Sequence, residues 1–358
     1  MPDKQTPDKQ TPGKQTLLIA TLPFNLAGPQ LYVAQITGNP KLRAAFNAEI
    51  WAIEDIYRGA AGKWRLLQDC KTRVAKDQNM VVYINQDLSL VAWLALCFKL
   101  AGAQKIAVHS HASSFSEPRT ALRRLIYQTL LNYTNPIRLA VSAGAATAMF
   151  GKKSASSTVL MPALIDFIKL AKQSETPCAR VSDDFTFACI GRMSAEKNQA
   201  LIINAFSMVL IGGQPAHLLL MGDGDSAYEA MLIALADSLG ISQSITFARA
   251  TQRIASVYRY QIDALLVPSV FEGQSRVVAE AQLFGIPVLT SIGVPDIAFI
   301  DITKAQVELP LDVKVWETAM RELIIAQPAQ TSPRLDVAQK SPLAVDSGID
   351  LLLKILQS

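Results

Sequence analysis

The chain has 358 residues, of which half are hydrophobic and 18% are charged, and its formal net charge is +4. This length accommodates two domains of about 150 residues, each with its own core. The longest apolar run, 88–98, is too short for a membrane span of about 20 residues, and the polar N-terminus does not read as a signal peptide. Four scattered cysteines favour free thiols and argue against zinc. We therefore expect a globular cytoplasmic protein.

The charge is divided unevenly along the chain. Residues 1–165 carry 19 Lys and Arg against 9 Asp and Glu, whereas residues 166–358 carry 15 against 21. A net charge of +10 beside one of −6 indicates that the N-terminal half meets an anionic partner. A phospholipid surface, a pyrophosphate-linked lipid and a nucleic acid all fit that description. The alternative is a basic surface that serves only solubility.

The first 16 residues repeat a polar five-residue unit, Pro-Asp-Lys-Gln-Thr, so we expect a disordered tail at 1–16. From residue 17 onward, short apolar segments alternate with stretches of helical periodicity. This alternation predicts right-handed βαβ units and parallel sheets. The expected strands are 17–22, 80–84, 105–108, 138–142, 185–190, 217–221, 244–247, 264–268 and 288–290. The expected helices include 200–210, 228–239 and 278–284.

The series of strands and helices occurs twice, with a polar break near 166–182. We therefore predict an α/β protein with two doubly wound domains, 17–165 and 166–340, facing each other across a cleft. A last apolar helix at 345–356 has no obvious place in the second sheet.

Two carboxylates, Glu272 and Glu280, are the most informative feature of the chain. Glu272 lies in a Phe-Glu-Gly turn after an apolar strand, and Glu280 lies inside the helix expected next. Eight residues of helix rise about 12 Å, which exceeds the roughly 5–9.5 Å that separate the carboxyl groups of a glycosidase. An elongated ligand at a helix N-terminus suits the spacing better, because free N–H donors attract anionic groups there. A diphosphate that carries a sugar at each end fits this description.

Two glycine turns follow strands in the second half. Gly191 ends one strand and is followed by Arg192 and Lys197, which offer a fork for phosphate oxygens and a point charge. By itself this segment also reads as an ordinary solvated loop. Gly222 opens a Gly-x-Gly turn that lacks the third glycine of a dinucleotide fingerprint, so a plain tight turn is the simpler interpretation.

The first half contributes histidines and arginines. His109 and His111 follow a strand, and they suggest a hydrogen-bonding histidine that faces the cleft or simple loop packing, since a metal site needs a third ligand. A helix nearby carries basic side chains on one side and an apolar stripe on the opposing side. The basic residues are Arg119, Arg123 and Arg124, and the stripe is Leu122, Leu125 and Ile126. We interpret this helix either as a solvated basic face or as a contact with an anionic acceptor or membrane surface.

Taken together, these segments resemble the retaining glycosyltransferases of family 4, which have the GT-B fold. The resemblance rests on Gly-Arg…Glu-Lys at 191–197, Gly-Asp-Gly at 222–224, the Glu-x7-Glu pair and Gly-Ile-Pro-Val at 285–288. Glu-Ala-Gln at 280–282 and His-Ser-His at 109–111 resemble the bacterial exopolysaccharide and capsular polysaccharide subgroup. The family fold implies two Rossmann-like domains facing a central cleft, with residues 341–358 returning to pack on the N-terminal domain.

The resemblance also implies a role for each site residue. Arg192 and Lys197 would neutralise the donor diphosphate, Glu272 would face the hexose, and Glu280 would take both ribose hydroxyls. Other residues would line the donor through their backbone or reach it from the first domain. They are Gly273, Gln274, Ser275, Gly191, Gly222, Gly28, and His111 or less favourably His109. Arg276 lies four residues from each glutamate and is able to pair with either.

The resemblance thus implies a metal-independent hexosyltransferase without a cofactor, acting with retention on a nucleotide-diphosphate sugar. The implied acceptor is a lipid-linked saccharide in surface polysaccharide biosynthesis. The implied partners are an anionic membrane surface, contacted peripherally from the cytoplasm, and other polysaccharide-assembly enzymes, but no nucleic acid. The rival interpretation is a catalytically silent GT-B module that acts as a partner or chaperone subunit of a true transferase.

Overall fold

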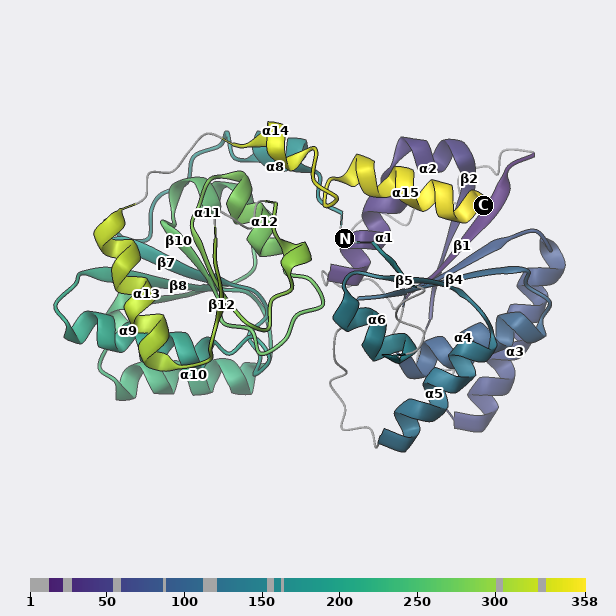
Figure 1. Cartoon of the computed structure of the whole chain (residues 1–358), viewed down its shortest axis with the longest axis horizontal. Coiled ribbons are helices and arrows are strands. Elements are labelled where there is room, and N and C mark those ends of the chain that lie inside the picture. The colour runs from purple at the N-terminus through teal and green to yellow at the C-terminus, as the bar shows by residue number, and fades with distance from the viewer. Residues whose placement is uncertain are drawn as a thin grey trace. The chain divides into compact units, whose positions relative to one another are not determined.

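The computed structural model describes residues 13–21, 28–53, 59–85, 88–111, 121–152, 158–161, 164–300, 305–327 and 333–358. The chain divides into two compact units. Unit 1 comprises Met1–Leu164 together with Val345–Ser358, and unit 2 comprises Ile165–Ala344. Each unit is built around one six-stranded parallel sheet (Figure 1).

The sheet of unit 1 has the strand order β2-β1-β3-β4-β5-β6, and every neighbouring pair is parallel. Its strands are β1 (Gln15–Thr21), β2 (Phe46–Ala52), β3 (Val81–Asn85), β4 (Lys105–Ser110), β5 (Ile137–Ala140) and β6 (Val159–Leu160). Its helices are α1 (Gly28–Gly38), α2 (Pro40–Ala45), α3 (Gly59–Lys76), α4 (Leu88–Leu100), α5 (Ala121–Tyr133), α6 (Ala143–Phe150) and α15 (Val345–Gln357).

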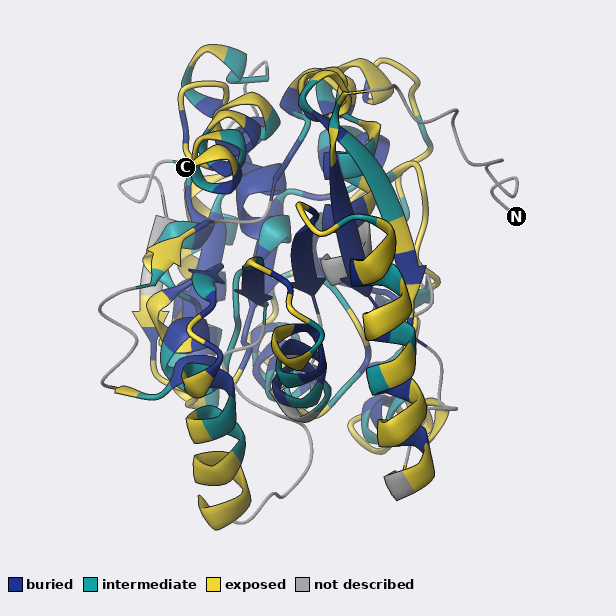
Figure 2. Cartoon of the chain, turned by 90° about the vertical axis from the view of Figure 1, so that its right-hand side faces the viewer, coloured by how far each residue is buried: buried dark blue, intermediate teal, exposed yellow. Residues whose placement is uncertain are grey.

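Side chains on each strand of unit 1 alternate between two cores, as the pleat requires. Leu18, Val82 and their neighbours face α3, α4, α5 and α6, whereas Leu17, Tyr83 and their neighbours face α1, α2 and α15. Figure 2 shows the buried strands inside unit 1 and the exposed outer surfaces of its helices. The sheet therefore lies between two helical layers.

The C-terminal helix α15 belongs to unit 1, although it follows the whole of unit 2 in sequence. Ile349, Leu352 and Leu356 are fully buried in the core that α1 and α2 also line. On the surface, Asp350 accepts a 2.7 Å hydrogen bond from Lys41 of α2. The helix thus closes one face of the first sheet.

The sheet of unit 2 has the order β12-β11-β10-β7-β8-β9 and is also parallel throughout. Its strands are β7 (Phe185–Ile190), β8 (Ala216–Met221), β9 (Ile245–Ala248), β10 (Ala264–Val267), β11 (Val288–Ser291) and β12 (Ala305–Leu309). Its helices are α8 (Phe167–Gln173), α9 (Gln199–Ile211), α10 (Ser226–Ser238), α11 (Ile254–Tyr260), α12 (Arg276–Leu283), α13 (Val313–Ala326) and α14 (Leu335–Ala338).

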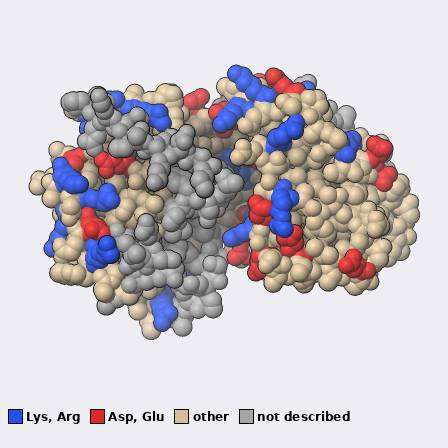
Figure 3. Space-filling view, turned by 180° about the vertical axis from the view of Figure 1, so that it is seen from behind, with Lys and Arg blue, Asp and Glu red and all other residues tan. Residues whose placement is uncertain are grey.

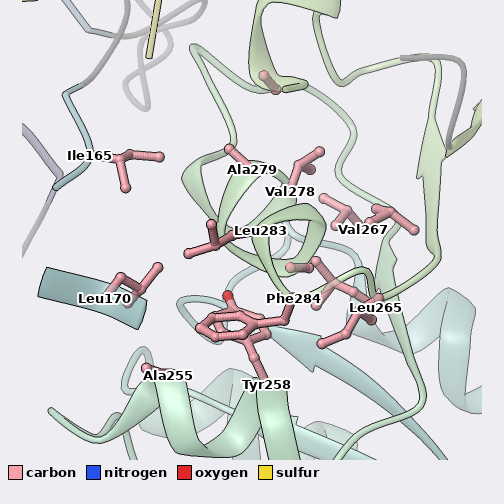
Figure 4. Close-up of a cluster of buried hydrophobic side chains, with 14 of the residues drawn as sticks. Ile165, Leu170, Ala255, Tyr258, Leu265, Val267, Val278, Ala279, Leu283 and Phe284 are labelled. Carbon is pink, nitrogen blue, oxygen red and sulfur yellow. The ribbon is translucent and has the colours of Figure 1, made fainter. Parts of the chain in front are cut away.

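The strand order of unit 2 is that of the doubly wound dinucleotide-binding fold, in which the order reverses between the first and fourth strands. Those strands are β7 and β10, which pair directly. On one face, α8, α11 and α12 pack against the sheet, and Figure 4 shows part of this core around Tyr258, Leu283 and Phe284. On the other face lie α9, α10 and α13.

The two doubly wound parallel sheets confirm the predicted fold class. The expected strands all form, within a few residues of their predicted ends. Three strands were missed, namely β2, β6 and β12, and each lies at an edge of its sheet. These three edge strands lack the continuous apolar run that marks a strand buried on both faces, so the pattern did not reveal them, whereas the fourth edge strand, β9, was predicted.

The helix of unit 1 that carries the paired arginines exposes its apolar stripe. Leu122, Leu125 and Ile126 of α5 do not pack inward but are 66%, 60% and 52% exposed. Arg123 and Arg124 are exposed beside them, while Arg119 lies outside the described residues. The first two turns of α5 therefore present apolar and basic side chains together at the surface.

Among the helices in the described part of the chain, none is long and apolar enough to cross a membrane. The apolar run at 88–98 forms most of α4, where Val91, Leu94 and Phe98 are fully buried. The four cysteines are free, and three of them are buried.

Candidate functional site

The predicted donor residues of unit 2 gather at the carboxyl edge of its sheet, around the point where the strand order reverses. Arg192 and Lys197 follow β7, Glu272 follows β10, and Glu280 lies on α12, which comes next. In open α/β sheets, ligands bind in the crevice outside the carboxyl ends of the strands at this reversal point. The topology thus brings together residues that are up to 88 positions apart.

The loops after β7 and β8 are fastened to each other through their backbones. Gly191 donates its N–H to Met221, Met193 donates to Asp223, and these hydrogen bonds are 2.9 and 3.0 Å long. A Cβ atom on Gly222, where φ is +156°, would lie 1.9 Å from the carbonyl oxygen of Gly191. Gly222 therefore permits the close approach of two backbones, which is a structural role beside the ligand role that the resemblance implied.

The loop after β10 is held from both sides. Val270 donates its N–H to the carbonyl of Glu196, and Glu272 donates its N–H to the carbonyl of Gly293, at 2.8 and 2.9 Å. A Cβ on Gly293 would lie 2.4 Å from the carbonyl oxygens of Ser269 and Val270. Sequence reasoning missed Gly293, although a glycine directly after a buried strand was a usable signal. Backbone hydrogen bonds thus connect the loops at this edge of the sheet to one another.

Lys197 and Glu272 form an ion pair across the β7 and β10 loops. The Glu272 side chain is only 8% exposed and that of Lys197 is 26% exposed. The same carboxylate oxygen also accepts a 2.9 Å hydrogen bond from the hydroxyl of Ser269. The carboxylate expected near the hexose is therefore held in a fixed position by a cation and a hydroxyl.

Arg192 differs from Lys197 because its side chain is 66% exposed. It contacts Glu196, four residues further along the same loop, at 3.1 Å. Exposed ion pairs contribute only about 0.2–1 kcal/mol. Arg192 can therefore leave Glu196 for a stronger anion at little cost.

The start of α12 offers backbone donors to a ligand. Ser275 occupies the N-cap position, where a serine hydroxyl ordinarily accepts a hydrogen bond from the helix. Among the described residues, however, the Ser275 hydroxyl has no partner, and α12 has no side-chain cap. Ser275 is 3% exposed, so a buried hydroxyl and uncapped N–H groups lie together at the positive end of the helix. Gly273 and Gln274, which precede it, are partly exposed.

Glu280 is buried on α12 and has two partners. Arg276 contacts one carboxylate oxygen at 3.5 Å, and the hydroxyl of Tyr258 donates to the other at 3.2 Å. Arg276 therefore pairs with Glu280, whereas Glu272 takes Lys197. Since α12 begins only at Arg276, half of the Glu272–Glu280 segment is loop, and the 12 Å rise expected for a continuous helix does not apply.

Tyr258 is a site residue that sequence reasoning missed. It is fully buried on α11, and its ring stacks on Phe284 with centroids 6.0 Å apart. Burial and then the charge of Glu280 raise the pKa of Tyr258 well above 10, so its hydroxyl stays protonated and acts as a donor. In the sequence Tyr258 reads as one more core position, and nothing local marks its hydroxyl.

In unit 1, His109 belongs to a buried network. Its Nε2 donates to the carbonyl of Met161 at 3.1 Å, which leaves Nδ1 to accept the hydroxyl hydrogen of Tyr83. Burial, and next the charge of His111, lower the pKa of His109 well below 6.5. Both ring nitrogens of His109 are therefore bonded inside the fold, and the ligand role that the resemblance implied for it stays a prediction.

His111 lies just beyond the carboxyl end of β4, with its ring 4.2 Å from that of His109. Its Nε2 is buried and, as far as the described residues show, has no hydrogen-bond partner. Burial lowers the pKa of His111 to about 3, so the ring is neutral near pH 7. Of the two histidines, only His111 keeps a nitrogen available for a ligand. Gly28 begins α1 at the same edge of the sheet, after β1.

Part of the chain matches a known protein family. Residues 174–304, which carry every donor-site motif of unit 2, match the family described as Glycosyl transferases group 1. Within the described residues, no three His, Cys, Asp or Glu side chains gather as a candidate metal site.

Among curated proteins, the chain is 30% identical over 159 residues to a D-inositol 3-phosphate glycosyltransferase of Mycolicibacterium smegmatis, covering 42% of this chain and 35% of that protein. It is 25% identical over 262 residues to the putative glycosyltransferase EpsF of Bacillus subtilis, covering 69% and 67%. The chain thus spans about a third of the length of the first relative.

Among solved structures, the chain is similar to Anabaena HepE in complex with UDP and glucose, with a TM-score of 0.75 and 16% identity. The similarity covers 96% of this chain and 100% of that one. Similar solved structures are GT-B glycosyltransferases, so the chain has the two-domain GT-B fold. Its matched segment is of the group 1 glycosyltransferase type.

Proposed function

We propose that the protein is a retaining hexosyltransferase of family 4 that uses a nucleotide-diphosphate sugar and needs no metal or cofactor. One observation carries the proposal: Arg192, Lys197 and the uncapped start of α12 surround the carboxyl edge of unit 2 at its reversal point. The solved HepE structures with UDP and glucose support a nucleotide-sugar donor.

The charges of the site suit a leaving diphosphate. As the glycosidic bond breaks, negative charge develops on the diphosphate. The exposed Arg192 side chain can then exchange its contact with Glu196 for one with the diphosphate. The N–H groups at the start of α12 and the hydroxyl of Ser275 would contact the same phosphates. Removing one such preorganised donor typically lowers the rate by about 10²–10³-fold.

The remaining residues would bind the two sugars. Glu272, held by Lys197 and Ser269, would accept hydroxyl hydrogens of the hexose. Glu280 would accept the two ribose hydroxyls. His111, neutral and with a nitrogen that has no partner among the described residues, is the further residue that we propose for the hexose.

The acceptor we propose is a lipid-linked saccharide in surface polysaccharide biosynthesis. The similarity to the putative glycosyltransferase EpsF, and the His-Ser-His and Glu-Ala-Gln segments, support this subgroup. The protein would work at the cytoplasmic face of the membrane beside other polysaccharide-assembly enzymes.

The first two turns of α5 supply the membrane contact in this proposal. Because α5 follows β4, these turns lie at the carboxyl edge of the first sheet, the edge that carries His111. Leu122, Leu125 and Ile126 are exposed beside Arg123 and Arg124, a composition typical of a helix that lies in an anionic lipid interface. Lys and Arg side chains are also spread over the described surface of unit 1 in Figure 3.

Turnover of the donor tests the enzymatic proposal. The purified chain should release the nucleoside diphosphate from one of UDP-, GDP- or dTDP-sugars, and Arg192→Gln should lower kcat about 10²-fold. Arg192 is exposed, so this variant should unfold at the wild-type temperature. Lys41→Gln, which removes an exposed ion-paired cation from α2, serves as the matched control. A folded protein that hydrolyses none of these donors, with or without acceptor lipid, would favour the silent module.

Vesicle sedimentation tests the membrane contact. The chain should bind phosphatidylglycerol vesicles more tightly than phosphatidylcholine vesicles, and 1 M salt should weaken the binding. Replacing Leu122, Leu125 and Ile126 together by Ser should lower the affinity at least about tenfold. Leu100→Ser, at the far end of α4 and 61% exposed, should change nothing. Equal binding by the triple variant and the wild type would refute this surface.

A further inference from the structure

The buried hydroxyl of Tyr258 donates a hydrogen bond to Glu280. The ring of Tyr258 lies against Phe284 within an otherwise apolar core formed by α8, α11, α12 and the sheet (Figure 4). A tyrosine hydroxyl in such a core needs a hydrogen-bond partner. Here the partner is a carboxylate oxygen of Glu280, 3.2 Å away.

Glu280 is held from two sides by different elements. Tyr258 reaches one carboxylate oxygen from α11, and Arg276 reaches the other from the preceding turn of α12. A carboxylate oxygen offers two lone-pair positions, so each oxygen keeps one for a further donor. Two neighbouring hydroxyls of one ligand are the donors that match two such positions on one carboxylate.

The two side chains that contact Glu280, Arg276 and Tyr258, differ in how firmly the fold fixes them. Arg276 makes a long contact of 3.5 Å and, among described residues, leaves its Nη1 without a partner. Tyr258 is fully buried, stacked on Phe284 and fixed on α11. The hydroxyl of Tyr258 is therefore the rigid element that determines where the carboxylate points.

We propose that Tyr258 is a positioning residue that orients the Glu280 carboxylate for the cis-diol of the donor ribose. The inference rests on the proposed function, because that function assigns the ribose to Glu280. Tyr258 itself does not touch the donor, and it acts only through Glu280. Removing the Tyr258 hydroxyl should weaken binding of the diol while leaving binding of the diphosphate and kcat unchanged.

A nucleotide that lacks the diol separates this role from a purely structural one. The probes are UDP and 2′,3′-dideoxy-UDP, with the corresponding guanosine pair if GDP is the nucleotide that binds, and binding is measured by calorimetry on the full chain. The wild type should bind the ribonucleotide about tenfold or more tightly than the dideoxynucleotide, because a hydrogen bond to a charged group contributes at least that factor in Kd. Tyr258→Phe keeps the stacked ring and should reduce this preference to about two- to threefold.

The affinity of Tyr258→Phe for the dideoxynucleotide should equal that of the wild type, and its KM for the nucleotide sugar should rise with kcat unchanged. Tyr260→Phe removes a hydroxyl from the same helix and should behave as wild type. In a Glu280→Gln background, which itself loses the preference, adding Tyr258→Phe should have no further effect. This second comparison holds even if the single variant is less stable.

Two results would overturn the inference. One is a Tyr258→Phe protein that keeps the wild-type preference for the ribonucleotide, and the other is an equal loss of affinity for both probes, which marks a structural role. A wild type that binds no nucleoside diphosphate would instead overturn the proposed function, and this inference with it. The two failures are therefore distinguishable.

Discussion

The Lys197–Glu272 pair allows a quantitative test of the site geometry. In Lys197→Met, the Glu272 carboxylate, only 8% exposed, loses its cation while Ser269 still donates a hydrogen bond. Breaking a buried ion pair by removing one partner costs about 3–5 kcal/mol. Because Lys197 is 26% exposed and Ser269 remains, we expect the lower end, about 3 kcal/mol.

For a unit of about 180 residues, such a loss lowers the unfolding temperature by roughly 6–12 °C. Glu272→Gln keeps a side chain that can accept from Ser269 and should cost less. The double variant leaves no charged group without its partner. Its loss of unfolding free energy should therefore be smaller than the sum of the two single losses by about 1–3 kcal/mol. Calorimetry and urea unfolding of all four proteins measure this coupling.

The exposed pair formed by Lys41 and Asp350 provides the matched control, because its side chains are 48% and 59% exposed. Lys41→Met, Asp350→Asn and their double variant should show no detectable coupling. If the losses of Lys197→Met and Glu272→Gln simply add, the two side chains do not form a pair in solution, and the arrangement of the β7 and β10 loops described above is wrong. Activity measurements on Lys197 variants must therefore be corrected for the folded fraction.

Further predictions concern the backbone contact and the histidines. Gly222→Ala should destabilise unit 2 strongly, because the added Cβ would lie 1.9 Å from the Gly191 carbonyl oxygen. The control is Gly240→Ala, whose Cβ meets nothing within 4 Å and which should cost only about the 1–2 kcal/mol of a left-handed residue. Equal losses of stability in urea unfolding would contradict this prediction. The pKa values of His109 and His111 are lowered by burial, so the unfolded chain binds protons below about pH 6.5 that the folded chain does not. Stability should thus be constant above that pH and fall below it by about 1.4 kcal/mol per pH unit for each histidine. His111→Gln should make the decline shallower between pH 6.5 and 5.5, and an unchanged slope would refute its burial.

The α/β class, the central strands and the sheet edge at which the candidate donor residues lie were all predictable from the sequence. Central parallel strands are buried on both faces, so they appear as apolar runs, and their carboxyl ends meet at one edge. Arg192, Lys197 and Glu272 follow such strands directly, which is why local motifs were sufficient to locate them. The edge strands β2, β6 and β12 carry no such run and emerged only in the structure.

The partner of each charged group became evident from the three-dimensional packing alone. Arg276 is equally far in sequence from both glutamates, but the start of α12 turns it to Glu280 and leaves Glu272 to Lys197. The same holds for Tyr258, whose hydroxyl finds Glu280 only because α11 and α12 pack together. A motif records the type and spacing of side chains, whereas an ion pair or hydrogen bond depends on distances of a few ångströms that loops and packing set.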